Sequence, residues 1–406
     1  MESCPLSCSP LETEENERKG TAPASGDAGH DHHDEHGSSD SDSLPPNMDT
    51  VQPVDRIPER QPILLLSLDG GGIRGLSSII ILERIMAEFN KDRTIPLQPY
   101  QVFSMIGGTS TGGLIALMLG RLRMTIDEVK EAYIDISQEA FRSSRYPFDP
   151  RRILDFFTFR ARFSGKALTK AIKETISRSG NSPECRLLEY RATAPENGSL
   201  EEHGARKHDC KTFVCTVHQG NASLAILSDY ESPHTFEDQP RGLKVWEAAR
   251  ATSAATSFFP AMEIRSSNLK MGYVDSGVVS NNPIHTVWNQ AHYFWPLDEY
   301  ELFLLSIGTG VSSDAKLSGG LNKITKALIK LATETERTAD EFSEDHHHLI
   351  KEELFFRFNV TQGLQDIQLD EAKNMNTIVE ATLAYLHKPM VANMVTRCVK
   401  RIKEKM

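Results

Sequence analysis

The sequence predicts an α/β protein: a three-layer α/β/α domain with a mostly parallel central sheet, followed by a helical C-terminal extension. Apolar strand-like runs alternate with helical patterns over residues 63–310, which is typical of a parallel sheet covered by helices on both faces. Two of these runs lead directly into a glycine-rich turn and then a helix. The 39% of hydrophobic and 25% of charged residues are ordinary values for a globular protein.

Residues 1–60 are expected to form a disordered acidic tail, because they hold few aromatic or β-branched residues and bury too little apolar area to offset ordering entropy. Residues 1–61 contain 14 acidic and 4 basic residues, and the net charge of the whole chain is −11, so the rest is nearly neutral. Neither part resembles a nucleic-acid surface, which needs a concentrated basic patch. The tract His30–His36 would bind a metal weakly, but a solvated acidic spacer is the simpler interpretation. We expect no metal and no cofactor.

The first strand is expected at Ile63–Leu68, a nearly continuous apolar run that ends in Asp69 and three glycines. Such a run indicates a strand that is buried on both faces. The next segment, Leu76–Phe89, has apolar residues at helical spacing. The chain therefore begins its ordered part as a strand, a tight turn and a helix.

The same arrangement follows a second time, with a strand at Val102–Ile106, a glycine-rich turn and a helix at Leu114–Leu122. Residues 180–210 are polar and predict an insertion loop. The remaining patterns predict helices and strands in alternation, and then helices alone after Gly310. The expected helices are 126–141, 166–176, 283–294, 321–331, 337–342, 377–385 and 391–402, and the expected strands are 212–217, 224–227, 272–274 and 302–307.

The second turn, Gly108-Thr109-Ser110-Thr111-Gly112, fits the pattern G-x-S-x-G between a strand and a helix. A sharp turn in this context exposes the serine hydroxyl above the sheet, and the flanking glycines avoid clashes. The helix that follows directs its N-terminal amides at any negative charge that forms there. We predict that Ser110 is a nucleophile, with a structural glycine-rich turn as the alternative.

The first turn, Gly70-Gly71-Gly72-Ile73-Arg74-Gly75, also fits the pattern of a dinucleotide-binding loop. That fingerprint requires an acidic residue at the end of a second strand about 20 residues on, whereas Glu88 and Asp92 lie at a helix end. Beside a serine turn, a run of glycines is better suited to an oxyanion hole made of backbone amides. Arg74 would orient this loop or meet an anionic head group.

The expected base is Asp275, which ends a short strand and precedes a turn. From that position the carboxyl edge of the sheet would direct it at Ser110. An aspartate before a turn is often only a turn residue, so this role depends on the other two motifs. The competing arrangement is a Ser–His–Asp triad with His285, but His285 is expected to open a helix that leads away from the edge.

Taken together, these motifs resemble the patatin-like phospholipase family over about residues 63–310, and Ala251–Pro260 resembles the stretch that the family carries before its Asp motif. One departure is Ser276, which stands between the Asp and the Gly of that motif. The resemblance implies a catalytic domain over 63–310 and a Ser–Asp dyad without a catalytic histidine. It also implies calcium-independent hydrolysis of acyl esters in phospholipids or neutral lipids, of the phospholipase A or lysophospholipase type. The implied site comprises Ser110 as nucleophile, Asp275 as base, the amides of Gly70, Gly71 and Gly72 as oxyanion hole, and Arg74, Gly75, Gly108, Gly112 and Gly277 as motif support.

Contact with lipid is expected to be transient and at the membrane surface. No apolar run approaches the roughly 20 residues of a membrane-spanning helix. The aromatic segment Ile153–Phe163 would serve as a lid or as a wall of the acyl groove, and the amphipathic segment Leu321–Leu331 as an interfacial helix. Each would also suit an ordinary core. Six dispersed cysteines and no signal-like N-terminus predict a reduced, cytoplasmic location. Two alternatives stay open: an acyltransferase with the same dyad and a non-catalytic lipid-binding module.

Overall fold

The computed structural model describes residues 60–141, 163–189, 210–231, 239–256, 258–266, 269–311, 335–365, 367 and 369–406. Its centre is an eight-stranded sheet in the order β5-β6-β3-β2-β1-β7-β8, with β4 pairing with β3 outside this path. The five strands from β3 to β8 run parallel, and β4, β5 and β6 run antiparallel to their neighbours. The strands are β1 (Gln61–Leu68), β2 (Met105–Thr109), β3 (Lys211–His218), β4 (Leu224–Ser228), β5 (Met262–Ser266), β6 (Leu269–Asp275), β7 (Tyr300–Ile307) and β8 (Phe355–Phe358).

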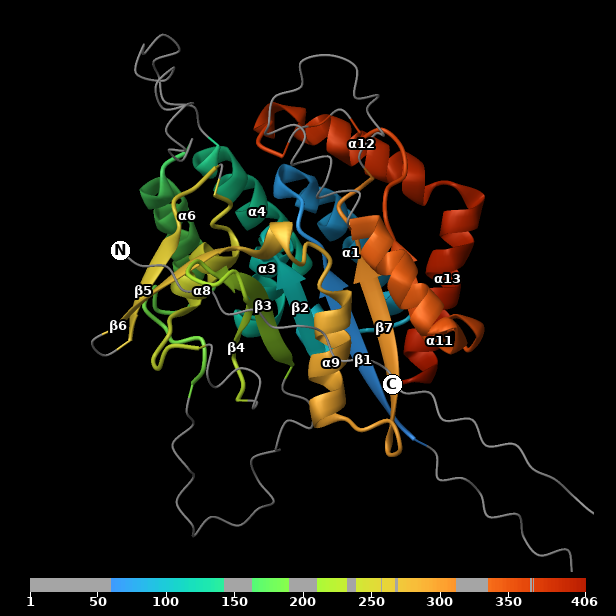
Figure 1. Cartoon of the computed structure of the whole chain (residues 1–406). Helices are drawn as coiled ribbons and strands as arrows, with labels where there is room; N and C mark the ends of the chain where they lie inside the picture. The colour runs from blue at the N-terminus through green and yellow to red at the C-terminus, as the bar shows by residue number, and fades with distance from the viewer. Residues whose placement is uncertain are drawn as a thin grey trace, which may run out of the picture. The chain divides into compact units, whose positions relative to one another are not determined.

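Helices cover both faces of this sheet, so the predicted three-layer α/β/α fold is confirmed (Figure 1). Helix α9 packs on β1 and β2, whereas α1, α3 and α8 pack on the opposite face, with α4, α6, α12 and α13 beyond them. The described residues 335–345 are also helical. The helices are α1 (Gly75–Asn90), α2 (Pro99–Val102), α3 (Thr111–Ala116), α4 (Ile126–Ala140), α6 (Gly165–Arg178), α8 (Val245–Thr252), α9 (Ile284–Phe294), α11 (His347–Lys351), α12 (Met375–Leu386) and α13 (Pro389–Glu404).

The second strand lies three residues later than the sequence predicted. Pro99–Val102 forms the short helix α2, and the strand β2 spans Met105–Thr109. Proline is favoured in the first turn of a helix, where its missing amide costs nothing. The prediction of Val102–Ile106 was therefore wrong at its start, because the apolar run crosses a helix end, but the strand still leads into the serine turn.

The C-terminal region contributes more than helices. The prediction of an all-helical extension missed β8, which pairs parallel with β7 and becomes an edge of the central sheet. A charged residue inside a strand weakens the sequence pattern of that strand, and Arg357 lies inside β8. The charge is explained by its acidic partners Asp69 and Glu336. Helices α12 and α13 pack against α1, so this region is joined to the rest of the fold through β8 and through the first helix.

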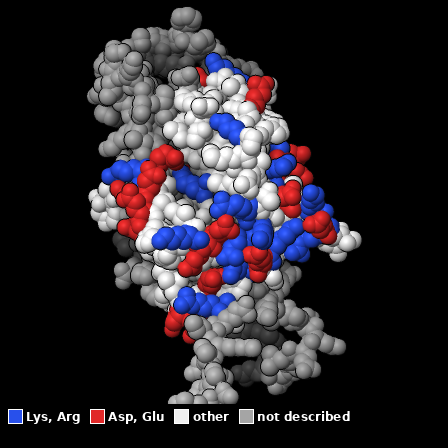
Figure 2. Space-filling model, turned by 90° about the vertical axis from the view of Figure 1, so that its right-hand side faces the viewer, with Lys and Arg blue, Asp and Glu red and all other residues white. Residues whose placement is uncertain are grey.

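Ion pairs between basic and acidic side chains cover the surface formed by α13. Arg397 contacts Glu353, Lys403 contacts Asp92 and Arg401 contacts Glu404. Figure 2 shows basic and acidic side chains intermixed on this face. Exposed pairs of this kind contribute little to stability. The charge of this surface is therefore balanced locally.

Several predicted segments lie outside the described residues. They are the tail with His30–His36, most of the candidate lid and of the polar loop, and the amphipathic Leu321–Leu331. The proposed domain boundary at residue 310 stays a prediction.

Candidate active site

Ser110 lies between β2 and α3 in a conformation that few residues adopt. Its backbone has φ 54° and ψ −123°, and a non-glycine residue in such a region persists only where its surroundings hold it. The Ser110 N–H donates to Thr252 Oγ1 at 2.9 Å, and that hydroxyl donates in turn to the Cys215 carbonyl at 2.7 Å. Helix α8 and strand β3 thereby fix the serine turn.

The two glycines that flank Ser110 are required by close backbone contacts. A Cβ on Gly108 would lie 2.3 Å from the Gly112 carbonyl oxygen, and a Cβ on Gly112 would lie 2.3 Å from the Leu68 carbonyl oxygen. A side chain at Gly108 would therefore clash within the turn itself, and one at Gly112 would push the turn away from the end of β1. These contacts bring the serine turn against the glycine loop that follows β1.

Asp275 reaches Ser110 from a strand that runs in the unexpected direction. Strand β6 is antiparallel to β3, with Asp275 opposite Thr216, while β2 pairs with β3 on the other side through Thr109 and Cys215. The C-terminal end of β6 therefore lies beside the turn that carries Ser110. Because β6 runs antiparallel to β3, this end does not belong to the carboxyl edge of the parallel strands. Ser110 Oγ lies 2.5 Å from Asp275 Oδ2.

The second carboxylate oxygen of Asp275 accepts a hydrogen bond from the Gly277 amide at 2.8 Å. The turn of the Asp-Ser-Gly motif thus forms with serine in the middle position. Burial raises the pKa of Asp275 to about 6, against the lowering effects of the Ser110 and Gly277 hydrogen bonds. A carboxylate with this pKa is a stronger base than one in water and is still ionised at neutral pH.

The three glycine amides of the first turn are not equivalent. Gly70 N–H donates to the Asn281 carbonyl at 3.0 Å, and Gly71 N–H donates to Thr111 Oγ1 at 3.1 Å. Gly72 N–H donates to no acceptor within the described part of the chain. The Gly72 amide is therefore free to bind a ligand, the Gly71 amide becomes free when the Thr111 side chain turns about its Cα–Cβ bond, and the Gly70 amide holds the loop.

Thr111 is a site residue that the sequence reasoning missed. It is the first residue of α3, and amides in the first turn of a helix have no intrahelical acceptor. In hydrolases whose nucleophilic serine lies in such a strand-to-helix turn, the backbone amide of the residue after the serine contributes to the oxyanion hole. The G-x-S-x-G pattern alone was therefore sufficient to find it.

The Ser110 side chain lines an apolar cavity, and Arg74 and Asp275 line the same cavity. Arg74 is 5% exposed, its Nε has no hydrogen-bond partner, and burial lowers its pKa to about 10. No carboxylate among the described residues pairs with it. The apolar part of the wall includes Leu114, Ile136, Phe141, Leu168, Phe258 and Phe259.

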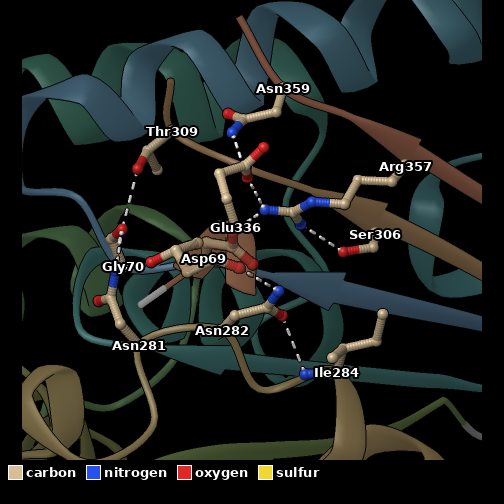
Figure 3. A network of polar contacts seen from close by, with 12 residues as sticks. Asp69, Gly70, Asn281, Asn282, Ile284, Ser306, Thr309, Glu336, Arg357 and Asn359 are labelled. Carbon is tan, nitrogen blue, oxygen red and sulfur yellow. Dashed lines mark hydrogen bonds and ion pairs between the residues drawn. The ribbon is translucent and has the colours of Figure 1, made fainter. Parts of the chain in front are cut away.

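A buried polar network supports the glycine loop from β8 (Figure 3). Arg357 Nη2 donates to Asp69 Oδ2 and to Glu336 Oε1, both at 2.8 Å, and Arg357 Nη1 donates to Ser306 Oγ at 2.8 Å. Asp69 is fully buried, and burial raises its pKa to about 6 although Arg357 lowers it.

The loop carbonyl itself is held from two further sides. Asn281 Nδ2 and Thr309 Oγ1 both donate to the Gly70 carbonyl, at 3.1 and 2.9 Å. Figure 3 shows these two side chains on either side of Gly70. Like Arg357, they were missed because their partners are distant in sequence.

Replacing Arg357 with methionine is expected to destabilise the fold by about 3 kcal/mol, because removal of one partner leaves Asp69 buried and unpaired. Urea unfolding measures this loss. The matched control is Arg397→Met, whose ion pair with Glu353 is exposed and should change stability by less than about 1 kcal/mol. Equal losses in the two variants would contradict the role of the buried pair.

His285 lies in the first turn of α9, as predicted, and its ring packs against Phe342 at 5.3 Å between centroids. Burial lowers its pKa. It does not line the cavity of Ser110 and Asp275. The described contacts therefore connect His285 to the helix of residues 335–345.

No cluster of three or more His, Cys, Asp or Glu side chains among the described residues is arranged to hold a metal ion. No helix within them is both long and apolar enough to cross a membrane.

A family model described as patatin-like phospholipase matches residues 66–288, which is more than half of the chain. Phospholipase A I of Arabidopsis thaliana is 27% identical over 351 residues, covering 77% of this chain and 26% of that protein. Human calcium-independent phospholipase A2-gamma is 26% identical over 318 residues, covering 77% of this chain and 36% of that protein. The chain thus spans about a quarter to a third of the length of these relatives.

Two solved structures are weakly similar to this chain, with low TM-scores. VipD from Legionella pneumophila has a TM-score of 0.32 and 13% identity, covering 81% of this chain and 67% of that one. Human GIVD cytosolic phospholipase A2 has a TM-score of 0.39 and 9% identity, covering 84% and 60%.

Proposed function

Because this chain belongs to the patatin-like phospholipase family, we propose that it is a lipid acyl hydrolase in which Ser110 and Asp275 form the catalytic dyad. The observation that carries the proposal is the 2.5 Å contact between Ser110 Oγ and Asp275 Oδ2. It occurs at a strained turn that faces an apolar cavity. Nucleophile and base are thus already within proton-transfer distance.

In the first half of the reaction, Asp275 accepts the Ser110 proton as Ser110 Oγ attacks the ester carbonyl carbon. The negative charge on the carbonyl oxygen is stabilised by the amides of Gly72, Thr111 and Gly71, each such donor contributing roughly 3 kcal/mol. The tetrahedral intermediate then collapses, the bond to the alcohol oxygen breaks, and Asp275 returns the proton to that oxygen. An acyl-Ser110 ester remains.

In the second half, Asp275 takes a proton from a water molecule that attacks the acyl carbonyl. Collapse of this intermediate breaks the bond to Ser110 Oγ, which recovers the proton from Asp275. A fatty acid leaves and the dyad is restored. The apolar wall of the cavity accommodates the acyl chain.

A fluorophosphonate probe tests the proposal directly, because it reacts with an activated serine. Labelling of the wild-type protein at Ser110, together with release of fatty acid from phosphatidylcholine micelles, supports a hydrolase. A folded protein that neither reacts with the probe nor releases fatty acid would instead be a lipid-binding module.

The buried guanidinium of Arg74 favours a phospholipid over a neutral acylglycerol as substrate. It lies in the wall of the same cavity without a counter-ion, and a buried charge without a partner is costly. A phosphodiester would supply the missing charge. The hydrogen bonds would be charge-assisted and therefore stronger than neutral ones.

Replacing Arg74 with methionine is expected to lower kcat/KM on phosphatidylcholine about tenfold, which corresponds to about 1.4 kcal/mol. The change on diacylglycerol in the same micelles should be under about threefold. The melting temperature should not fall, since an unpaired buried charge is replaced by an apolar chain of similar length. A loss of the same size on both lipids would contradict a role in head-group selection.

A further inference from the structure

We propose that a second groove, separate from the cavity of Ser110, binds a phosphate group through Arg250, Lys166 and the N-terminus of α6. The groove is open and has a volume of about 1170 Å³. Its wall is formed by α6, by Trp246 and Arg250 of α8, and by Pro260. It shares neither Ser110 nor Asp275 with the cavity, so the inference does not depend on the proposed hydrolysis.

Arg250 is the first feature that points to an anion. The residue is 2% exposed, its Nη2 donates to the Pro260 carbonyl at 3.2 Å, and its Nη1 has no hydrogen-bond partner among the described residues. Arg357, whose side chain is 12% exposed, contacts two carboxylates. Arg250 lies over the ring of Phe259 at 5.8 Å from its centroid, but it contacts no carboxylate within the described part of the chain.

The second feature is the helix terminus beside it. Helix α6 spans 14 residues and begins at Gly165, with Ser164 as its N-cap. A Cβ on Gly165 would lie 3.1 Å from Arg250 Nη2, so the guanidinium lies directly against the first turn. The Ala167 amide donates to Ser164 Oγ at 3.3 Å, and the remaining amides of the first turn and the helix dipole make such a terminus favourable for phosphate. Two positive groups therefore meet at one end of the groove.

The third feature is the set of lysines on α6. Lys166, Lys170 and Lys173 line the groove, at the spacing that places helical residues on one face. Lys173 contacts Glu184 at 2.5 Å, and Lys170 lies 3.6 Å from Glu174. Lys166 has no ion-pair partner in the described residues and is exposed. Its charge adds to that of Arg250.

The groove is consequently more positive than the α13 surface, where every basic side chain discussed above has an acidic partner. Glu174 is the one carboxylate among the described residues of its wall. A phosphate dianion would compensate the charges of the guanidinium and of Lys166 and would accept hydrogen bonds from the free helix amides. Its source is either a lipid head group at a membrane surface or a free phosphate compound.

Two measurements distinguish these sources. In the first, the melting temperature is measured in sodium phosphate and in sodium chloride of equal ionic strength; binding to the folded state should raise it by about 2 °C. In the second, sedimentation is measured with ether-linked phosphatidylcholine vesicles that contain phosphatidic acid or phosphatidylglycerol. Ether lipids have no ester to hydrolyse, so binding is separated from catalysis.

The test variant is Lys166→Gln combined with Lys170→Gln, and Arg250→Met is the second variant. The control is Lys400→Gln combined with Lys403→Gln, which removes the same charge from exposed positions of α13. If Arg250→Met fails to fold, the lysine double variant alone still tests the proposal. Melting temperatures in chloride report folding for all of them.

The expected result is that wild type and control respond to phosphate, to phosphatidic acid, or to both, and that the groove variants lose at least about three-quarters of the response. A response to phosphate alone identifies a free compound, and tighter binding to phosphatidic acid than to phosphatidylglycerol identifies a head group. The proposal is overturned if wild type responds to neither, or if the folded groove variants respond as wild type does.

Discussion

Replacing Ser110 with alanine is expected to abolish ester hydrolysis, with kcat lower by at least about 10⁴-fold. The reaction as proposed passes through an ester on Ser110 Oγ, and no other hydroxyl lies at 2.5 Å from the Asp275 carboxylate among the described residues. The fold should be retained, because the substitution removes one oxygen that faces a cavity. The remaining oxyanion donors would support only a small residual rate.

A soluble p-nitrophenyl ester and circular dichroism measure the two quantities. Ser253→Ala is a suitable control, since Ser253 lines the same cavity but its hydroxyl donates to the Ala249 carbonyl at 2.6 Å. This control should keep its rate within about threefold, as expected for loss of a hydrogen bond worth about 1 kcal/mol. Residual activity above a few per cent in Ser110→Ala would indicate another nucleophile.

Replacing Asp275 with asparagine is expected to lower kcat/KM by at least about 100-fold, the usual cost of losing a general base. Asparagine preserves the size of the side chain but cannot accept the Ser110 proton. Burial raises the pKa of Asp275 to about 6, and the base acts only when it is ionised. The wild-type rate should therefore fall as the pH decreases through about 6.

His285→Ala is the matched test of the triad alternative. His285 packs on Phe342 and lies outside the cavity, so its loss should change kcat/KM by less than about threefold. Both variants are to be measured on one soluble ester, with melting curves as the folding check. If folded His285→Ala is as inactive as Asp275→Asn, the base is a histidine and the dyad assignment fails.

The local parts of the fold and of the candidate site could be predicted from the sequence. Ser110 and the glycine loop each follow an apolar strand directly, so a few neighbouring residues specify their turns. The three-layer fold follows from the alternation of strands and helices. These features depend on spacing within about 20 residues, which periodicity reports well.

Features that depend on distant pairing could not be predicted in the same way. The direction of β6 depends on its partner β3, and nothing in Leu269–Asp275 alone distinguishes parallel from antiparallel pairing. The role of Arg357 could not be inferred from its neighbours because its partner Asp69 is 288 positions away. The unequal roles of the three glycine amides likewise depend on Asn281 and Thr111.

The bond between Asp69 and Arg357 also concerns the order in which the protein is made. Synthesis proceeds from the N-terminus, and domains assemble as their segments emerge. Strand β1 and its glycine loop leave the ribosome long before β8, so until residue 357 has been added Asp69 has no cation to pair with. A nascent chain therefore carries the serine turn well before the loop opposite it is braced. The hydrolysis proposed above would accordingly begin only near the end of translation, when Arg357 of the last strand reaches Asp69 beside the first.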